Sequence, residues 1–216
     1  MLLPCSFLAG SFPNYEAYLA SLPQGLDSYP HCVSKGSIVR IFAHGLPKEV
    51  VSNLPDAVRG NVAEPPQMSE WFPFVRIAAI THAVQDQMFL HDDEGLRMWF
   101  AEGMQSVLSN SMYSVLIALV SPARLLRTGD KRWTAFHRGL ERETLAVYEN
   151  GARGKISYPP HLVDEILAEG IIQAFERALA LSRAPNPVVV LKEWTPEYFV
   201  SESLFDQSKP RGAQIR

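Results

Sequence analysis

The sequence predicts an α+β fold, in which an N-terminal layer of helices packs on a C-terminal antiparallel sheet of about four strands with one long crossing helix. Two strand patterns at residues 144–149 and 152–158 flank a two-residue turn signal. A helical pattern then covers residues 160–184, followed by strand patterns at 188–194 and 197–201. The order is therefore hairpin, helix, hairpin, and short hairpin connections imply antiparallel pairing.

Helical patterns fill the first two thirds of the chain after an irregular start. Residues 1–34 are broken by prolines and a glycine, so we interpret them as an arm draped on the domain or an interaction segment, with one short helix at 15–22. Residues 60–66 are expected to form a loop, and residues 128–130 to break the chain again. The helices are predicted at residues 35–44, 47–54, 69–88, 92–108, 112–120 and 121–127.

Local signals suggest where several helices start. Ser69 is expected to cap the third of them, with Pro73 in its first turn. Acidic residues at 92–94 favour the start of the next helix, because they oppose the positive end of its dipole. Residues 112–120 are apolar nearly all round, which predicts burial in the helical layer or in an oligomer interface. Residues 131–142 fit either a last helical turn or an extended lead into the sheet.

The C-terminal third carries the sharpest signals. Asn150-Gly151 predicts a type I′ hairpin turn, which needs positive φ at both central residues. Pro160 fits the first position of the long helix, and acidic residues stand in its first turns. Gly170, Ala174 and Ala178 recur every fourth residue, so they form a small-residue groove along one helix face. We expect this groove to let the helix lie close to the sheet.

Composition indicates an ordinary globular protein, predicted to comprise an arm (1–34), one α+β domain (35–205) and a flexible tail (206–216). The net charge of −3 argues against nucleic-acid binding through a broad basic surface. Cys5 and Cys32 cannot form a disulfide scaffold, so reduced thiols in a cytoplasmic protein are predicted. No apolar run is long enough for a signal peptide or a membrane span, which predicts a soluble protein.

Three segments resemble a known protein family. They are Lys-Gly-Ser-Ile-Val-Arg at 35–40, Ser-Pro-Ala-Arg-Leu-Leu-Arg-Thr-Gly at 121–129 and Tyr-Glu-Asn-Gly at 148–151. Together with the order of elements over residues 35–203, they are similar to a paralogous family abundant in myxobacteria. That family is related to the superfamily of haem-nitric-oxide-binding domains, four-vinyl-reductase domains and transport-protein-particle subunits. The resemblance implies binding of haem, lipid or another small hydrophobic ligand between helices and sheet, or a dimerising interaction module.

The haem-binding branch of this superfamily implies a proximal histidine well upstream of a Tyr-x-Ser-x-Arg motif that grips the haem propionates. Here Tyr148 is followed by Arg153, one position too far, and the serine is missing. The nearest upstream histidine, His137, lies only eleven residues before Tyr148, closer than the family spacing. The sequence therefore predicts no haem and no other cofactor.

No constellation of reactive residues stands out. The segment His-Asp-Asp-Glu at 91–94 is interpreted as a helix start, so no metal site is predicted. His82 lies on the apolar face of its helix and is interpreted as a satisfied core or pocket-edge histidine. His31-Cys32 suggests a thiolate beside an imidazole, but adjacent side chains diverge and no third group orients them. Cys32 is also an acylation candidate by analogy with a transport-protein-particle subunit. No nucleotide or hydrolase motif is present, and no catalytic residue is assigned.

Two sets of residues are candidates for binding. Side chains that could line a ligand pocket between helices and sheet are Trp71, Val75, His82, Trp99, Tyr113 and Phe175. The one basic stretch could meet an anionic ligand or an acidic partner, or it could form a solvated face. Its candidate residues are Arg124, Arg127, Arg132 and Arg138.

The predicted function is a non-enzymatic sensory or scaffolding module that binds a small apolar ligand or a protein partner and forms a homodimer. The dimer rests on the apolar residues 112–120 and on the resemblance. A small enzyme using a pocket histidine or cysteine is the alternative from another class, and a haem-based gas sensor is the third. Nucleic-acid binding is not expected.

Overall fold

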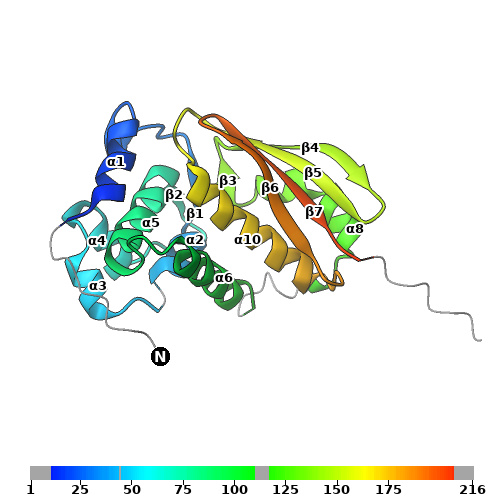
Figure 1. Cartoon of the computed structure of the whole chain (residues 1–216), viewed down its shortest axis with the longest axis horizontal. Helices are drawn as coiled ribbons and strands as arrows, with labels where there is room; N and C mark the ends of the chain where they lie inside the picture. Colours follow the sequence, from blue (N-terminus) through cyan, green and yellow to red (C-terminus); the bar gives the residue numbers. More distant parts are fainter. Residues whose placement is uncertain (1–10, 44, 110–116, 207–216) are drawn as a thin grey trace, which may run out of the picture.

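The structure, a computed structural model, describes residues 11–43, 45–109 and 117–206. The helices before residue 110 gather at one side of the molecule and a four-stranded sheet lies at the other, with one long helix across the sheet and α8 (Pro122–Arg127) beside it (Figure 1). This arrangement confirms the predicted α+β fold, including the antiparallel sheet and its crossing helix. Within these residues no helix is long and apolar enough to cross a membrane.

The helical side surrounds one buried helix, α5 (Phe74–Met88). Thirteen of its residues, beginning with Phe74, are buried, because α1, α2, α3 and α4 all contact it. A helix enclosed in this way is apolar on several faces rather than on one stripe. The other elements of this side are α1 (Pro13–Ser21), η1 (Gly25–Asp27), α2 (Gly36–Ala43), α3 (Lys48–Asn53), α4 (Asp56–Ala63) and α6 (Asp93–Ser109), the last of which packs on α2 and α10 (Glu165–Leu181).

The main sheet has the strand order β4-β5-β7-β6, with every neighbouring pair antiparallel. α10 (Glu165–Leu181) connects β5 to β6 and packs on the inner face of the sheet. Side chains alternate between the faces of a strand, so Ile156 and Phe199, which pair across β5 and β7, are both buried in the core. The strands are β4 (Glu141–Tyr148), β5 (Gly151–Ser157), β6 (Val188–Thr195) and β7 (Tyr198–Leu204).

A second sheet of three very short strands was not predicted. Its order is β2-β1-β3, formed by β1 (Val33–Lys35), β2 (Trp71–Pro73) and β3 (His137–Arg138). Ser34 pairs with Phe72 on one side and with His137 on the other. Strands of two or three residues carry too little alternation for a pattern to reveal. The sheet joins the end of the arm to the segment that leads into β4.

Several predicted helix boundaries are wrong. The helix expected at 69–88 begins only at Phe74, after β2, so Ser69 is not its cap and Pro73 precedes it. Residues 60–66 are not simply a loop, because α4 extends to Ala63. The break expected at 128–130 is bridged, since α9 (Gly129–Trp133) follows α8 (Pro122–Arg127) directly. The apolar run at 112–120 lies largely outside the described residues.

The hairpin between β4 and β5 forms where predicted, but its turn differs. Tyr148 pairs with Gly151, so the two turn residues are Glu149 and Asn150. None of residues 149–151 has the positive φ that a type I′ turn requires. Gly151 is needed for space instead, because a Cβ there would clash with the backbone oxygen of Ser203 on β7.

The crossing helix α10 begins five residues later than predicted, so Pro160 is not its first residue. Asp164 is the N-cap, and its carboxylate accepts a hydrogen bond from the backbone N–H of Leu167 at 3.0 Å. The small-residue groove exists, but at Gly170 it faces α6 rather than the sheet. A Cβ on Gly170 would lie 3.2 Å from the ring of Phe100.

A buried carboxylate fixes α1 to α5. Asp86, which is 5% exposed, accepts hydrogen bonds from the backbone N–H groups of Asn14 and Tyr15 at 3.1 and 3.0 Å. The side-chain amide of Asn14 donates to the same carboxylate at 2.7 Å. An acid at this position satisfies donors that have no partner within the helix. The hydroxyl of Tyr18 also donates to the carbonyl of Leu162 at 3.0 Å, which ties α1 to the start of α10.

Candidate functional site

Two hollows border α10. One is a cavity of about 410 Å³ with an almost wholly apolar wall, and the other is a polar cleft of about 510 Å³ around the N-terminal end of the helix. Both volumes fall within the range of small-molecule sites in proteins. Their lining side chains differ in kind and in how their charged groups are paired.

The apolar cavity lies among α6, α8, α9, α10 and the sheet. Ala174 and Ala178 on α10 form a wall without large side chains, which leaves room in the interior, whereas the ring of Phe100 packs against Gly170. Trp133 and Phe175 meet edge to face, with ring centroids 5.9 Å apart. The other apolar lining residues are Ile38, Phe74, Ile77, Phe100, Met104, Ile117, Leu125, Leu126, Ala135, Phe136, Leu167, Ile171 and Leu179.

His137 contributes a buried imidazole to the cavity wall. Its Nδ1 lies 2.7 Å from the hydroxyl oxygen of Ser34 on β1. Its ring stacks on Trp133, with centroids 3.8 Å apart and planes 21° apart. Burial lowers the pKa of His137 to about 3, because the charged form would lose its hydration. His137 is therefore neutral near pH 7 and adds no charge to the cavity.

Two arginines also line the cavity, and their surroundings differ. Arg142 on β4 is paired with Asp130 on α9, and the same carboxylate accepts a hydrogen bond from Thr144 at 2.9 Å. Burial lowers the pKa of Arg142, while Asp130 acts in the opposite direction. Arg132 on α9 donates from Nε to the hydroxyl oxygen of Thr128 at 3.0 Å. Every acidic residue of the chain lies within the described ranges, and none forms an ion pair with Arg132.

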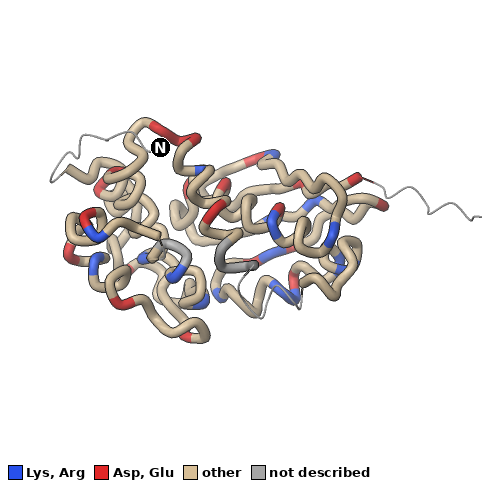
Figure 2. Tube along the Cα trace, turned by 90° about the horizontal axis from the view of Figure 1, so that it is seen from below, with Lys and Arg blue, Asp and Glu red and all other residues tan. Residues whose placement is uncertain are grey.

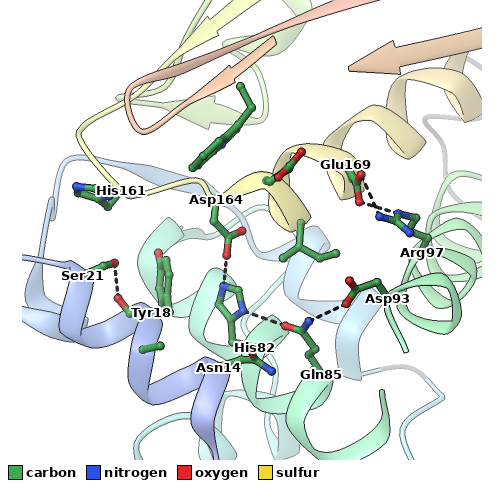
Figure 3. Close-up of a pocket in the computed structure, with 14 residues that line it drawn as sticks. Asn14, Tyr18, Ser21, His82, Gln85, Asp93, Arg97, His161, Asp164 and Glu169 are labelled. Carbon is green, nitrogen blue, oxygen red and sulfur yellow. Dashed lines mark hydrogen bonds and ion pairs between the residues drawn. The ribbon is translucent and has the colours of Figure 1, made fainter. Parts of the chain in front are cut away.

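The polar cleft is formed where α1, α5 and α6 meet the start of α10 (Figure 3). Side chains from all four elements point into the same space, although they are far apart in the sequence. The lining residues are Asn14, Ala17, Tyr18, Ser21, His82, Gln85, Asp93, Arg97, His161, Asp164, Glu165, Ile166, Glu169 and Trp194.

His82 is the centre of a chain of polar contacts in this cleft. Its Nε2 lies 3.0 Å from a carboxylate oxygen of Asp164, although the N–H is not aligned for a strong hydrogen bond. Its Nδ1 lies 3.3 Å from the amide oxygen of Gln85, and the Gln85 amide nitrogen reaches Asp93 at 3.4 Å. The ring of Tyr18 packs against the imidazole, with centroids 4.8 Å apart. His82 thus links α5 to the starts of α6 and α10.

Arg97 closes another side of the cleft by joining α6 to α10. Its Nε and one terminal nitrogen donate to the two carboxylate oxygens of Glu169 at 2.7 and 3.2 Å. This hydrogen bonding raises the pKa of Arg97, and the negative charges of Glu169, Asp93 and Glu94 add to the effect. The cation of the cleft is therefore paired, in contrast to Arg132 at the cavity.

The described residues support no catalytic assignment. The imidazole of His82 is 3% exposed, and among the described residues no serine, threonine or cysteine side chain forms a hydrogen bond with it. Cys32 is fully buried, and burial raises the pKa of its thiol to about 11, which keeps it protonated. The hydroxyl of Ser21 donates to the carbonyl of Tyr18. The described part of the chain also holds no group of three or more His, Cys, Asp or Glu side chains able to share a metal ion.

The structure does not bring the predicted pocket residues together. Phe175 lines the apolar cavity and His82 lines the polar cleft, whereas Val75 is buried in the core and lines neither. Trp99 packs against the rings of Phe89 and Phe100. Tyr113 lies outside the described residues. Trp71 is on β2, where the cationic groups of Lys35 and Arg138 lie over its ring, and it lines neither hollow.

The four predicted arginines lie on three elements with different surroundings. Arg124 and Arg127 are exposed on α8, and Arg132 on α9 lines the apolar cavity. Arg138 on β3 stacks over Trp71, with its guanidinium 4.0 Å from the ring centroid. In Figure 2, acidic and basic residues are interspersed on both the helical side and the sheet side of the chain. Only Arg132 of the four borders either hollow.

Sequence reasoning missed several residues that line the two hollows. In the cleft these include Tyr18, Asp93, Arg97, Asp164 and Glu169, and in the cavity Trp133, His137 and Arg142. The row Gly170, Ala174, Ala178 was a usable signal for the cavity, because small residues at one face leave space as well as permit close packing. No comparable local signal marks the cleft.

Comparisons with known proteins bear on the fold. No protein-family model and no curated protein matches the sequence. The Fe(II) unliganded H-NOX protein from K. algicida is 9% identical, with a TM-score of 0.55 over 81% of this chain and 97% of that chain. An oxygen-binding H-NOX domain related to soluble guanylate cyclases, in its oxygen complex, is 10% identical, with a TM-score of 0.57 over 80% and 93%. A structure addressing H-NOX activation is 10% identical, with a TM-score of 0.58 over 81% and 97%.

These matches show that the chain shares the fold of H-NOX domains. At such low identity they show the fold alone. Membership of the narrower myxobacterial family stays a prediction.

The shared fold raises the question of whether the apolar cavity suits haem. Haem needs an axial ligand and carries two propionates. The described lining offers one imidazole, His137, whose Nδ1 contacts Ser34 and whose ring stacks on Trp133. Of the two lining guanidinium groups, only that of Arg132 has no acidic partner. Tyr148, the residue compared with the haem motif, lies at the β4–β5 turn and lines neither hollow. The described lining therefore offers a single unpaired cation, whereas the two propionates of haem carry two negative charges.

Proposed function

We propose that this protein is a non-enzymatic ligand-binding module that takes a small apolar molecule into the cavity beside α10 and serves a sensory or scaffolding role. The cavity itself carries the proposal, because it combines about 410 Å³ of space with an apolar wall and only a few polar side chains. This composition is typical of small-molecule sites.

Packing supports an occupant for this cavity. Protein interiors are close-packed, and voids much larger than a water molecule are few. A ligand that buries apolar surface against Phe100, Trp133 and Phe175 gains about 25 cal/mol for each Å² removed from water. The small residues on α10 keep the space open at the cost of contacts that larger side chains would make.

α10 offers a physical connection between ligand binding and the rest of the molecule. The helix borders the cavity along its middle, while its first turn is held by Asp164 and His82 in the cleft. A ligand that shifts α10 would therefore change contacts at α1, α5 and α6. A sensory role also suits a fold shared with an oxygen-binding H-NOX domain.

The proposal is tested by native mass spectrometry of the purified chain and by titration with the neutral, apolar fluorophore N-phenyl-1-naphthylamine. Ala174→Phe should fill the cavity and weaken probe binding at least tenfold. Gln173→Phe is the matched control, since it adds the same ring to α10 at a position that does not line the cavity. Unchanged probe affinity in a folded Ala174→Phe protein would count against the cavity as the site.

A haem-based gas sensor is the second candidate, favoured by the shared H-NOX fold and opposed by the lining residues. Its test is the absorption spectrum of protein expressed with excess haem precursor. A Soret band that disappears in His137→Ala would establish haem binding, and a spectrum without that band would exclude this candidate.

We also propose that this module forms a homodimer and can bind a protein partner. The dimer rests on the apolar run at 112–120, most of which lies outside the described residues. Light scattering at several protein concentrations tests it, and a monomer mass at every concentration would overturn the dimer without affecting the cavity proposal.

A further inference from the structure

Arg132 is held in a geometry that suits an anionic ligand. Its Nε donates to the hydroxyl oxygen of Thr128, and that hydroxyl in turn donates to the backbone carbonyl of Arg124 at 2.8 Å. This fixes one edge of the guanidinium group. Among the described residues, neither terminal nitrogen of Arg132 has an acceptor, so its forked end is free to bind a carboxylate through two N–H groups.

The charge at the cavity amounts to a single positive unit. Arg142 is neutralised by Asp130, and His137 is uncharged near pH 7 because burial lowers its pKa. No aspartate or glutamate pairs with Arg132, and all aspartates and glutamates lie in the described residues. An uncompensated cation beside an apolar wall favours a ligand that brings one negative charge and an apolar body.

We infer that the ligand of this cavity is an amphiphile with one anionic head group, a long-chain carboxylate, whose apolar chain lies along Ala174 and Ala178 and whose head pairs with Arg132. The inference rests on the proposed function and adds the chemical class of the ligand. The inference also explains why Arg142 has an acidic partner and Arg132 has none. If both arginines lacked one, the cavity would favour a ligand with two negative charges.

Two fluorescent probes test the inference: 11-(dansylamino)undecanoic acid and its methyl ester, which differ only in the charge of the head. The acid should bind at least tenfold more tightly than the ester at pH 7.5. Arg132→Gln should weaken binding of the acid by about ten- to a hundredfold and leave binding of the ester unchanged, so that the preference for the acid is lost. Arg127→Gln is the matched control, because it removes an equal charge from exposed α8 and should leave both affinities unchanged.

The outcomes separate the inference from the proposed function. If neither probe binds and native mass spectrometry finds empty protein, the cavity is not a ligand site and both fail. If acid and ester bind equally well, the cavity is a site and only the anionic head is wrong. If Arg132→Gln and Arg127→Gln lose the same affinity for the acid, the head group does not bind at Arg132. Arg132→Lys, which keeps the charge without the planar fork, should retain part of the preference and guards against misfolding of the glutamine variant.

Discussion

The cleft and the cavity border the same helix but differ in how their charged groups are satisfied. In the cleft, Asp164 contacts His82 and caps α10, and Arg97 pairs with Glu169. In the cavity, the cation of Arg132 has no acid. The more polar hollow is therefore the one whose side chains hold the fold together. Polar density alone is a poor guide to a binding site, and a cation without an acidic partner is a better one.

The largest effect is expected from breaking the pair that neutralises the cavity wall. Asp130→Ala leaves the guanidinium of Arg142, which is 11% exposed, without its acid. We expect unfolding free energy to fall by about 2–3 kcal/mol, less than for a fully buried pair because Asp130 itself is 43% exposed. Urea denaturation followed by circular dichroism measures it.

Asp56→Ala is the control for this experiment. It breaks the Asp56–Arg59 pair, which lies within one helix turn and is exposed, so it should cost no more than about 0.5 kcal/mol. Similar losses for the two variants would show that the Arg142 pair is as solvated as a surface pair.

The second prediction concerns pH and the buried imidazole of the cavity. The pKa of His137 is about 3 in the folded protein, against an ordinary value near 6.5 when unfolded. Below pH 6.5 the unfolded chain binds a proton that the folded protein does not, so stability falls as pH falls. The loss reaches about 2 kcal/mol at pH 5, at a slope of up to about 1.4 kcal/mol per pH unit.

His137→Phe removes this titration while keeping a ring against Trp133. Denaturation of both proteins between pH 7.5 and pH 5 should therefore give a flatter profile for the variant, whatever its stability at pH 7.5. Parallel profiles would mean that His137 gains a proton in the folded state as readily as in the unfolded one. The comparison of slopes cancels the titration of the other histidines, which both proteins share.

The third prediction separates two roles of Asp164 in the cleft. Asp164→Ala removes both the N-cap of α10 and the contact with His82, and should cost about 1–2 kcal/mol. Asp164→Asn keeps a capping oxygen and loses only the charge beside the imidazole. Thermal melts of both variants give the contribution of each role. Equal losses would show that the cap contributes little and that the His82 contact dominates.

Local periodicity was sufficient to predict the main sheet and α10. Ile156 and Phe199 are buried as partners on β5 and β7, and this alternation is visible in each strand alone. Where one residue serves a distant contact, the same reasoning gave a wrong detail. The Asn-Gly signal predicts that Gly151 is a turn residue, yet a glycine is required there because the backbone of Ser203, on a strand far along the chain, lies against it.

The cleft could not be predicted because its contacts span the chain. Tyr18 packs on His82 and bonds to Leu162, a partner 144 residues away. Asp164 and Glu165 were expected near the first turn of the long helix for dipole reasons, but nothing local indicates that Asp164 meets His82. The pairing of Arg142 with Asp130, and hence the isolation of Arg132, likewise depends on how α9 packs on β4.

The smallest changes in unfolding free energy are expected from substituting Arg97 in the cleft and Arg132 in the cavity. Arg97→Gln breaks a partly exposed pair between α6 and α10 and should lower unfolding free energy by about 1 kcal/mol at low salt, and by less at 1 M NaCl. Arg132→Gln should change it by no more than about 0.5 kcal/mol at either salt concentration, because no acid loses a partner. Denaturation at both salt concentrations makes the comparison. A salt-sensitive loss in Arg132→Gln equal to that in Arg97→Gln would mean that Arg132 serves the fold, and the two hollows would then no longer differ in how their cations are held.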